Sequence, residues 1–264
     1  MQTLVIKLSG NIIADPSAPQ KLAAYVQRQQ QAGRRVVISH GGGRQINELS
    51  TRLSVPVRQI AGRRITDEAA REVLLYTVGG KANRELVAGL RSCGIAAVGL
   101  SGVDGGLTTA TRRAPISIEG ETIDFGWVGE IESVDTTVAE TLLKAHFVPV
   151  IGCLTWSADH GILNVNADTF ALHLALGLQA CELVTLMEPE GVRDAAGNTL
   201  SMCTRDDWKR GLQQGWIRDG MKPKLQTAFE ALEKGVPSVL LTNPEALLAG
   251  GGTRLVLTDQ SGNQ

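Results

Sequence analysis

Short apolar runs alternate with amphipathic stretches along most of the chain. Runs rich in Val, Ile and Leu occupy residues 3–9, 35–39, 95–99 and 147–151, and stretches with helical periodicity separate them. Such alternation is typical of parallel strands that are connected by helices lying on both faces of a sheet. The pattern therefore predicts an α/β fold with a mostly parallel central sheet.

Further elements continue this rhythm. Helices are predicted over about 17–32, 43–53, 67–92, 136–145, 167–178, 204–214 and 221–234. Strands are predicted at 162–165, 182–187, 237–241 and in the tail that ends at Val256. The stretch 67–92 contains Gly79-Gly80, and we expect the helix to break there because glycine weakens a helix interior.

Residues 56–66 and 107–133 follow a different pattern. The first segment is predicted to form a short hairpin. In the second, β-prone runs lie at 107–111, 116–118 and 122–125. Polar turns separate these runs, which favours antiparallel hairpins at one edge of the sheet. No clear domain break is visible, and the best seam lies near residue 180.

Composition narrows the classes of function. The net charge is -1 and the aromatic content is 4%, so no nucleic-acid partner is expected. No apolar run is long enough to span a bilayer and no signal peptide precedes the first strand, so we expect no membrane partner. The four cysteines and four histidines form no CxxC motif and no zinc-ligand spacing, which predicts free thiols in a reducing cytoplasm and no metal held by the protein.

Several common catalytic motifs are absent. The sequence lacks GxxxxGK[ST], the HRD and DFG pair, GxGxxG after the first strand, GxSxG and HExxH. P-loop enzymes, protein kinases and dinucleotide-binding folds are therefore disfavoured.

A glycine run at a strand-to-helix junction is the first candidate for chemistry. His40-Gly41-Gly42-Gly43 follows the strand 35–39 and precedes a helical pattern. Glycines leave backbone N–H groups open to a ligand, and the helix start adds the positive end of its dipole. The run predicts a cradle for a phosphate or a carboxylate. The alternative is a tight turn that needs positive φ.

Cationic side chains lie at two further points. Lys7 stands near the end of the first strand, followed by Ser9 and Gly10. Lys222 and Lys224 occupy the first turn of helix 221–234, where they oppose the helix dipole. Because this placement has no evident structural benefit, one of them is expected to face an anion. Solvated surface lysines are the alternative.

Polar residues converge before the helix 167–178. Asn164 and Asn166 alternate along a strand and so point to the same face, and Asp168 follows in the first helical turn. Asn166 alone would account for capping of the helix. The three side chains are therefore expected to have a functional role in addition to capping of the helix.

These clusters jointly predict phosphoryl transfer. The transferred group carries spread negative charge, which two lysines and backbone N–H donors would stabilise. Asp168 would orient the lysines rather than act as a base. Arg63 or Arg64 would hold a carboxylate of the acceptor through two parallel hydrogen bonds.

Sequence motifs spread over nearly the whole chain match one known family. In chain order they are VIKLSG (5–10), VVISHGGGRQI (36–46), GRRITD (62–67), VGGKANRELV (78–87), IAAVGLSGVDGGL (95–107), WVGEIESVD (127–135), VPVIG (148–152), LNVNADTFA (163–171), IRDGMKPKLQTAFEAL (217–232) and GGTRLV (251–256). On these motifs the chain resembles the amino acid kinase family, and within it the members that phosphorylate N-acetylglutamate.

The resemblance implies an open three-layer αβα sandwich. An N-terminal lobe (1–180) would bind the amino-acid substrate and form a dimer, and a C-terminal lobe (181–264) would bind ATP. The implied reaction is ATP-dependent phosphorylation of the side-chain carboxylate of N-acetyl-L-glutamate. It gives N-acetyl-L-glutamyl 5-phosphate and ADP, in the second step of arginine biosynthesis.

The resemblance also implies roles for individual residues. The catalytic residues would be Lys7 and Lys224, which stabilise the transferring phosphoryl group, and Asp168, which organises both lysines. The substrate-binding residues would be Gly42, Gly43, Arg64 and Asn164. The nucleotide-binding residues would be Gly10, Glu188, Gly191, Val192, Gly220 and Met221. Mg²⁺ would be held by the nucleotide phosphates.

Three positions depart from the family pattern. Ser9 replaces the first glycine of a pair, which would restrict the backbone. Glu188 stands where an aspartate is expected on the nucleotide side. Trp156 is expected near the acyl pocket, where it would alter which N-acyl group fits. The chain also starts at its first strand, without the N-terminal helix that resembles the hexamer-forming segment of arginine-inhibited members. We therefore expect a homodimer without arginine feedback, joined through helix 67–92.

Alternative functions stay open at this point. N-succinylglutamate, an N-blocked aminoadipate, carbamate or a nucleoside monophosphate would suit related kinases, although Arg63-Arg64 and Asn164 favour an amino-acid acceptor. A ligand sensor that kept the fold without catalysis belongs to a different class. The joint presence of Lys7, Asp168 and Lys224 argues against it.

Overall fold

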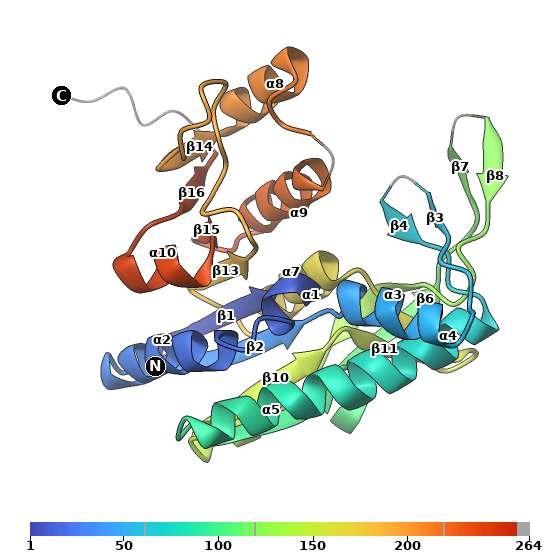
Figure 1. Ribbon diagram of the computed structural model, residues 1–264. Helices are drawn as coiled ribbons and strands as arrows, with labels where there is room; N and C mark the ends of the chain where they lie inside the picture. Colours follow the sequence, from blue (N-terminus) through green and yellow to red (C-terminus); the bar gives the residue numbers. More distant parts are fainter. Residues whose placement is uncertain (61, 119, 219, 258–264) are drawn as a thin grey trace.

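An eight-stranded sheet forms the centre of the molecule (Figure 1). A computed structural model describes residues 1–60, 62–118, 120–218 and 220–257. The strands of the sheet, in spatial order, are β14 (Met202–Thr204), β16 (Thr253–Val256), β15 (Val239–Thr242), β13 (Glu182–Leu186), β1 (Thr3–Leu8), β2 (Arg35–His40), β10 (Val148–Gly152) and β5 (Ala97–Ser101). Among the described residues of this sheet, β15 and β16 are the one pair of neighbouring strands that runs antiparallel. The predicted mostly parallel sheet is confirmed.

Helices cover both faces of this sheet, which makes three layers. They are α1 (Gly10–Ile13), α2 (Ala18–Gln31), α3 (Gly43–Arg52), α4 (Glu68–Leu74), α5 (Asn83–Ser92), α6 (Thr137–Lys144), α7 (Ala167–Gly177), α8 (Arg205–Gln214), α9 (Met221–Glu233) and α10 (Pro244–Ala249). Alternate residues of β1 enter two separate cores, because successive side chains of a strand point to opposite faces. Leu4 and Ile6 pack with α2 and α5, whereas Val5 packs on the face of α7 and α9.

The expected break at Gly79-Gly80 is wrong. A π-helical segment, η1 (Leu75–Ala82), contains both glycines and joins α4 to α5 without interruption. A Cβ atom on Gly79 would lie 3.2 Å from Leu154 Cδ1. The glycine therefore serves close packing against a neighbouring strand instead of ending the helix.

A second, four-stranded sheet lies beside the central one. Its strands, in spatial order, are β12 (Gly161–Asn164), β11 (Leu154–Ser157), β6 (Thr108–Arg112) and β9 (Gly129–Val134). The antiparallel pairing expected in 107–133 is confirmed, but the first run lies in this second sheet and the other two pair with each other, so the described residues of these runs add no edge to the central sheet. The short 3₁₀ turn η2 (Asp104–Gly106) leads into β6.

Two small hairpins extend from this region at the same end of the molecule (Figure 1). One pairs β3 (Gln59–Ile60) with β4 (Arg63–Arg64), and the other pairs β7 (Ile116–Ile118) with β8 (Glu121–Ile123). The Thr66 backbone N–H donates to the Phe125 carbonyl at 2.9 Å and so joins their bases. Within the described residues, no helix combines the length and the apolar character that a membrane crossing requires.

Candidate active site

A cavity of about 250 Å³ opens at the carboxyl ends of β1, β2 and β10, and we call it the central cavity. Its lining residues are Lys7, Leu8, Ser9, Gly10, Gly41, Gly42, Gly43, Ile46, Gln59, Gly62, Arg63, Arg64, Arg113, Val128, Cys153, Asn164, Val165, Asn166, Ala167, Asp168 and Lys224. They come from β1, the β2–α3 junction, the β3–β4 hairpin, the second sheet, and the first turns of α7 and α9. Segments far apart in sequence thus meet around one space.

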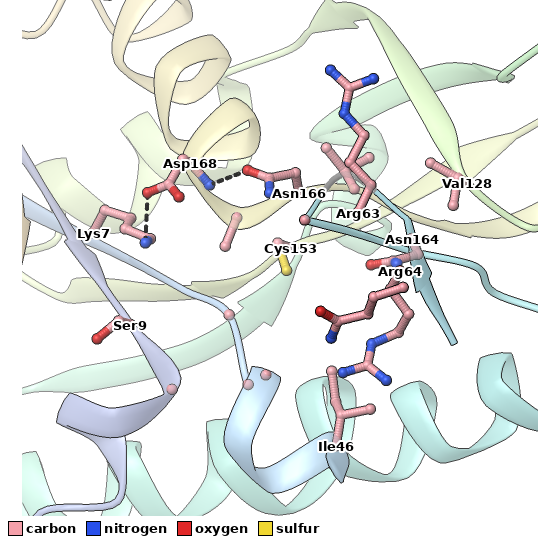
Figure 2. Close-up of a pocket in the computed structure, with 18 of the residues that line it drawn as sticks. Lys7, Ser9, Ile46, Arg63, Arg64, Val128, Cys153, Asn164, Asn166 and Asp168 are labelled. Carbon is pink, nitrogen blue, oxygen red and sulfur yellow. Dashed lines mark hydrogen bonds and ion pairs between the residues drawn. The ribbon is translucent and has the colours of Figure 1, made fainter. Parts of the chain in front are cut away.

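Asp168 joins the two predicted lysines at one end of the central cavity, and Figure 2 shows its contact with Lys7. Its Oδ1 atom lies 2.6 Å from Lys7 Nζ, and its Oδ2 atom lies 3.4 Å from Lys224 Nζ. Lys7 alternates with the apolar Ile6 and Leu8 on β1, so its side chain reaches the face covered by α7. Asn166 caps α7 by accepting from the backbone N–H groups of Asp168 and Thr169.

The charges in this group stabilise one another. Burial alone would raise the pKa of Asp168, but attraction from Lys7 and Lys224 outweighs it and sets that pKa at about 2. Burial lowers the pKa of Lys7, and the attraction of Asp168 opposes this change. At neutral pH the Asp168 carboxylate is therefore ionised and engaged on both oxygens. Such a group is suited to holding the two ammonium groups and not to abstracting a proton.

The glycine run forms a close backbone junction and not a positive-φ turn. Gly41, Gly42 and Gly43 all lack positive φ, which decides against the tight-turn alternative. A Cβ atom on Gly41 would lie 2.9 Å from the Cβ atom of Ala167. A Cβ atom on Gly10 would lie 2.9 Å from the backbone nitrogens of Gly43 and Arg44. The β1–α1 loop and the start of α3 therefore approach each other so closely that only glycine fits at residue 10.

A buried network of polar groups supports the backbone of the glycine run Gly41–Gly43. His40 is fully buried, and its Nδ1 atom lies 2.8 Å from the Gly41 carbonyl. Its Nε2 atom lies 2.9 Å from Asn83 Nδ2, which also donates to the Val150 carbonyl. Burial lowers the pKa of His40 to about 4, so the ring is neutral at pH 7 and donates from Nδ1 while it accepts at Nε2. Gln45 Nε2 donates to the Gly10 carbonyl at 2.9 Å and ties the loop after β1 to α3.

The opposite end of the central cavity carries arginines and an amide. Figure 2 shows Arg64 and Asn164 on the side away from Lys7 and Asp168, with Cys153 between them. Arg64 donates to Asn47 Oδ1, and burial lowers the pKa of its guanidinium group. Asn164 Nδ2 donates to Thr66 Oγ1 at 3.0 Å.

Trp156 does not lie where the sequence placed it. The side chain is 42% exposed and is not among the residues that line the central cavity. It stands further along β11, opposite Ile162, whereas Cys153 directly follows β10 and reaches the cavity. Burial raises the pKa of the Cys153 thiol to about 12, so this wall of the cavity is uncharged. Trp156 therefore cannot shape the cavity by direct contact.

A second cavity of about 400 Å³, here called the side cavity, adjoins the first. Its lining residues are Ser9, Gly10, Asn11, Gly43, Arg44, Met187, Glu188, Pro189, Gly220, Met221 and Lys224. Ser9, Gly10, Gly43 and Lys224 line both cavities. The Glu188 carboxylate accepts a hydrogen bond from Asn11 Nδ2 at 2.7 Å.

Three further residues considered from the sequence, Gly191, Val192 and Lys222, also lie outside the lining of both cavities. Gly191 and Val192 do not line the side cavity, and the Val192 N–H donates to Thr253 Oγ1 at 2.8 Å. Lys222 is exposed and lines neither cavity, so the choice between the two lysines of α9 falls on Lys224.

Ser9 fits its position without backbone strain. Its φ of -77° and ψ of 159° are ordinary extended values that any residue adopts, so the expected restriction of the backbone has no cost here. Its Oγ atom is buried and has no hydrogen-bond partner among the described residues. The hydroxyl is therefore free to donate to a ligand that occupies either cavity.

Comparison with known proteins decides the family. A sequence profile of the amino acid kinase family matches residues 2–243. The chain belongs to the amino acid kinase family. The resemblance recognised from the sequence motifs is thereby confirmed.

Relatives within this family support the same grouping. The chain is 37% identical to the acetylglutamate kinase of Myxococcus xanthus, over 97% of this chain and 89% of the relative. It is 38% identical to the acetylglutamate kinase of Methanopyrus kandleri, over 82% of this chain and 89% of the relative. Among solved structures, smu.665 from Streptococcus mutans UA159 is similar with a TM-score of 0.83 and 27% identity, over 97% and 99% of the two chains. A carbamate kinase from Giardia, at 14% identity and a TM-score of 0.68 over 97% and 99% of the chains, shares the fold.

Sequence reasoning missed several residues around this amino acid kinase site. His40, Asn83, Gln45, Arg113 and Cys153 line or support the central cavity but were not selected. His40 could have been found from its place directly before the glycine run. The others have no local signal, because their role depends on which segments meet in three dimensions.

Proposed function

We propose that this amino acid kinase transfers the terminal phosphoryl group of ATP to the γ-carboxylate of N-acetyl-L-glutamate. The products are N-acetyl-L-glutamyl 5-phosphate and ADP, and the reaction serves the second step of arginine biosynthesis. One observation carries the proposal: Asp168 holds Lys7 and Lys224 at one end of a cavity that presents Arg64 and Asn164 at the other. The acetylglutamate kinases among the relatives support the choice of acceptor.

The acceptor would lie along the central cavity. Arg64 would hold the α-carboxylate by charge-assisted hydrogen bonds, and Asn164 would contact the bound N-acetylglutamate. The γ-carboxylate would then extend toward Gly42 and Gly43, whose backbone N–H groups start α3. This placement brings the nucleophilic oxygen to the lysine end of the cavity.

The lysines would stabilise the transferring group. A γ-carboxylate oxygen forms a bond to the terminal phosphorus as the bond to the bridging oxygen breaks, and the electron pair of that bond leaves with ADP. Lys7 and Lys224 would neutralise charge on the phosphoryl oxygens, while Asp168 keeps both ammonium groups in place. No proton has to be removed from the acceptor, because a carboxylate is ionised at neutral pH.

The nucleotide would occupy the side cavity. Gly10, Glu188, Gly220 and Met221 line it, and Lys224 stands where it meets the central cavity. Gly191 and Val192 would act behind this lining, as support for the loop after β13. We propose that Mg²⁺ is held by the nucleotide phosphates, since both oxygens of Asp168 are already engaged by lysines.

Two broader proposals concern organisation. Residues 1–180 would form the acceptor lobe and 181–264 the nucleotide lobe, with one sheet running through both because β13 pairs with β1. The protein would act as a homodimer joined through the helical segment 67–92, on which the Tyr76 side chain is 55% exposed. The free state of all four cysteines is consistent with a cytoplasmic location.

A coupled assay of ADP release tests the function. We expect turnover with ATP and N-acetyl-L-glutamate, and much slower turnover with N-acetyl-L-aminoadipate, whose extra methylene displaces the reactive carboxylate. Faster turnover with the aminoadipate would reassign the acceptor. An absence of ADP with every acceptor would favour the non-catalytic sensor instead.

A further inference from the structure

The central cavity carries more positive charge than the proposed acceptor needs. Lys7 and Lys224 share Asp168 and face the phosphoryl position, and Arg64 is sufficient for the α-carboxylate. Two guanidinium groups, those of Arg63 and Arg113, line the same cavity without a task in that scheme. Guanidinium groups are the side chains best matched to a carboxylate, because they offer two parallel donors.

Arg113, a lining residue of the central cavity, is held in place by two hydrogen bonds. Its backbone N–H donates to the Val128 carbonyl at 2.8 Å, and its Nε atom donates to Glu130 Oε1 at 3.0 Å. The side chain is 17% exposed. Within the described residues its two Nη groups form no hydrogen bond, so they are free to donate to a ligand.

Arg63 is not a duplicate of Arg64. The two residues are neighbours on β4, where Arg63 pairs with Ile60 and Arg64 pairs with Gln59. Successive side chains of a strand point to opposite faces. In Figure 2 the two side chains extend in different directions from the hairpin, although both line the cavity. Arg63 thus reaches a different part of the acceptor than Arg64 does.

The acceptor offers only one group for these arginines. This argument rests on the proposed function, in which the γ-carboxylate faces the lysines and Arg64 holds the α-carboxylate. The remaining substituent on the α-carbon is the acylamino group, so only the acyl chain is left to extend toward Arg63 and Arg113. Val128, next to Arg113, gives that chain an apolar wall against which methylene groups can pack.

We infer that Arg63 and Arg113 form a second carboxylate subsite, and that the enzyme accepts N-acyl-L-glutamates whose acyl chain ends in a carboxylate. N-succinyl-L-glutamate is the smallest suitable probe with a flexible chain. Its neutral counterpart, N-succinamoyl-L-glutamate, has the same length and nearly the same shape but no terminal charge. The comparison of the two separates recognition of charge from tolerance of size.

The test measures kcat/KM for ADP release by the full chain with both probes and with N-acetyl-L-glutamate. The wild-type enzyme is expected to favour the succinyl over the succinamoyl probe by roughly tenfold, the effect of one charge-assisted hydrogen bond. Arg63→Gln and Arg113→Gln are each expected to bring this ratio close to one. Arg58→Gln, on the same segment but outside the cavity lining, is the matched control and should leave the ratio unchanged.

Each outcome decides something. A wild-type ratio near one, with turnover of N-acetyl-L-glutamate intact, overturns the subsite and leaves the proposed function standing. A preference for the carboxylate that survives in both arginine variants overturns the assignment to Arg63 and Arg113. The absence of ADP with all three acceptors overturns the proposed function and, with it, the subsite. Should Arg113→Gln fail to fold, Arg63→Gln on the exposed hairpin still decides the case.

Discussion

At the residue scale, the site depends on how a few charges compensate one another. Asp168 is ionised because two lysines surround it, and Lys7 tolerates burial because Asp168 lies 2.6 Å away. Removal of Asp168 leaves the buried Lys7 ammonium group without a partner, which is far more costly than the loss of a surface pair.

Asp168→Asn tests this compensation through acid unfolding. The pKa of Asp168 is about 2 in the folded protein and 3.8 as a free group, so its ionised form stabilises the fold above about pH 4. That contribution, about 2 kcal/mol, is lost as the pH falls toward 2. Denaturant unfolding between pH 7 and 2 should therefore show a smaller loss of stability in the variant, which starts from a less stable state at pH 7. Parallel curves for the two proteins would contradict the charge assignment.

His40 provides a second prediction at this scale. His40→Leu removes the donor to the buried Gly41 carbonyl and the acceptor that faces Asn83 Nδ2, so kcat/KM should fall by roughly tenfold or more. Asn can place its Nδ2 group where His40 has Nδ1, and His40→Asn should restore a large part of the loss. Because the ring is neutral above its pKa of about 4, the wild-type rate should show no inflection from His40 near pH 6.5. Equal losses of kcat/KM in the two variants would indicate that His40 contributes only through packing.

The same scale shows what a sequence can and cannot reveal. Lys7, Asp168 and Lys224 could be selected because each stands at a strand end or helix start where its charge has no local explanation. Asn83 and Gln45 could not be selected, since each is an ordinary polar residue within a predicted helix and nothing in the local sequence calls for a further role. The expectation for Trp156 failed because the period of a strand gives the face on which a side chain lies but not its distance from the cavity.

At the element scale, the close approach of the β1–α1 loop and α3 determines the position of the backbone N–H groups of the glycine run.

The alternation of strands and helices was enough to predict most elements within a few residues. The short helices α1 and α10 and the strand β14 were not predicted. Each is too short for its hydrophobic residues to show a helical or strand periodicity. The glycines were recognised, but their reason, contact between two backbone segments, needed the structure.

Gly10→Ala tests that contact. The added Cβ would lie 2.9 Å from two backbone nitrogens of α3, which cannot move aside as a flexible side chain would. We expect a loss of about 1–3 kcal/mol in the free energy of unfolding, together with a lower kcat. Gly43→Ala is the comparison for stability, since its Cβ would meet no atom within 4 Å. Equal stability of the two variants would show that the junction is looser than described.

At the scale of the whole molecule, the order of the strands brings the two ends of the sequence together. β1 lies between β2 and β13, so the first strand of the chain contacts elements from both halves. Residue 7 and residue 224 therefore meet on one carboxylate although more than two hundred residues separate them in sequence. A strand-by-strand prediction gives the members of such a sheet but not their order.

The most direct test compares turnover and nucleotide affinity in Lys224→Ala. If Lys224 acts on the transferring phosphoryl group, kcat should fall by at least roughly 100-fold while the Kd for ATP changes far less. Lys222→Ala, the exposed neighbour on the same helical turn, should retain wild-type kcat. A kcat for Lys224→Ala within about threefold of wild type, at saturating substrates, would remove this lysine from phosphoryl transfer and contradict the account.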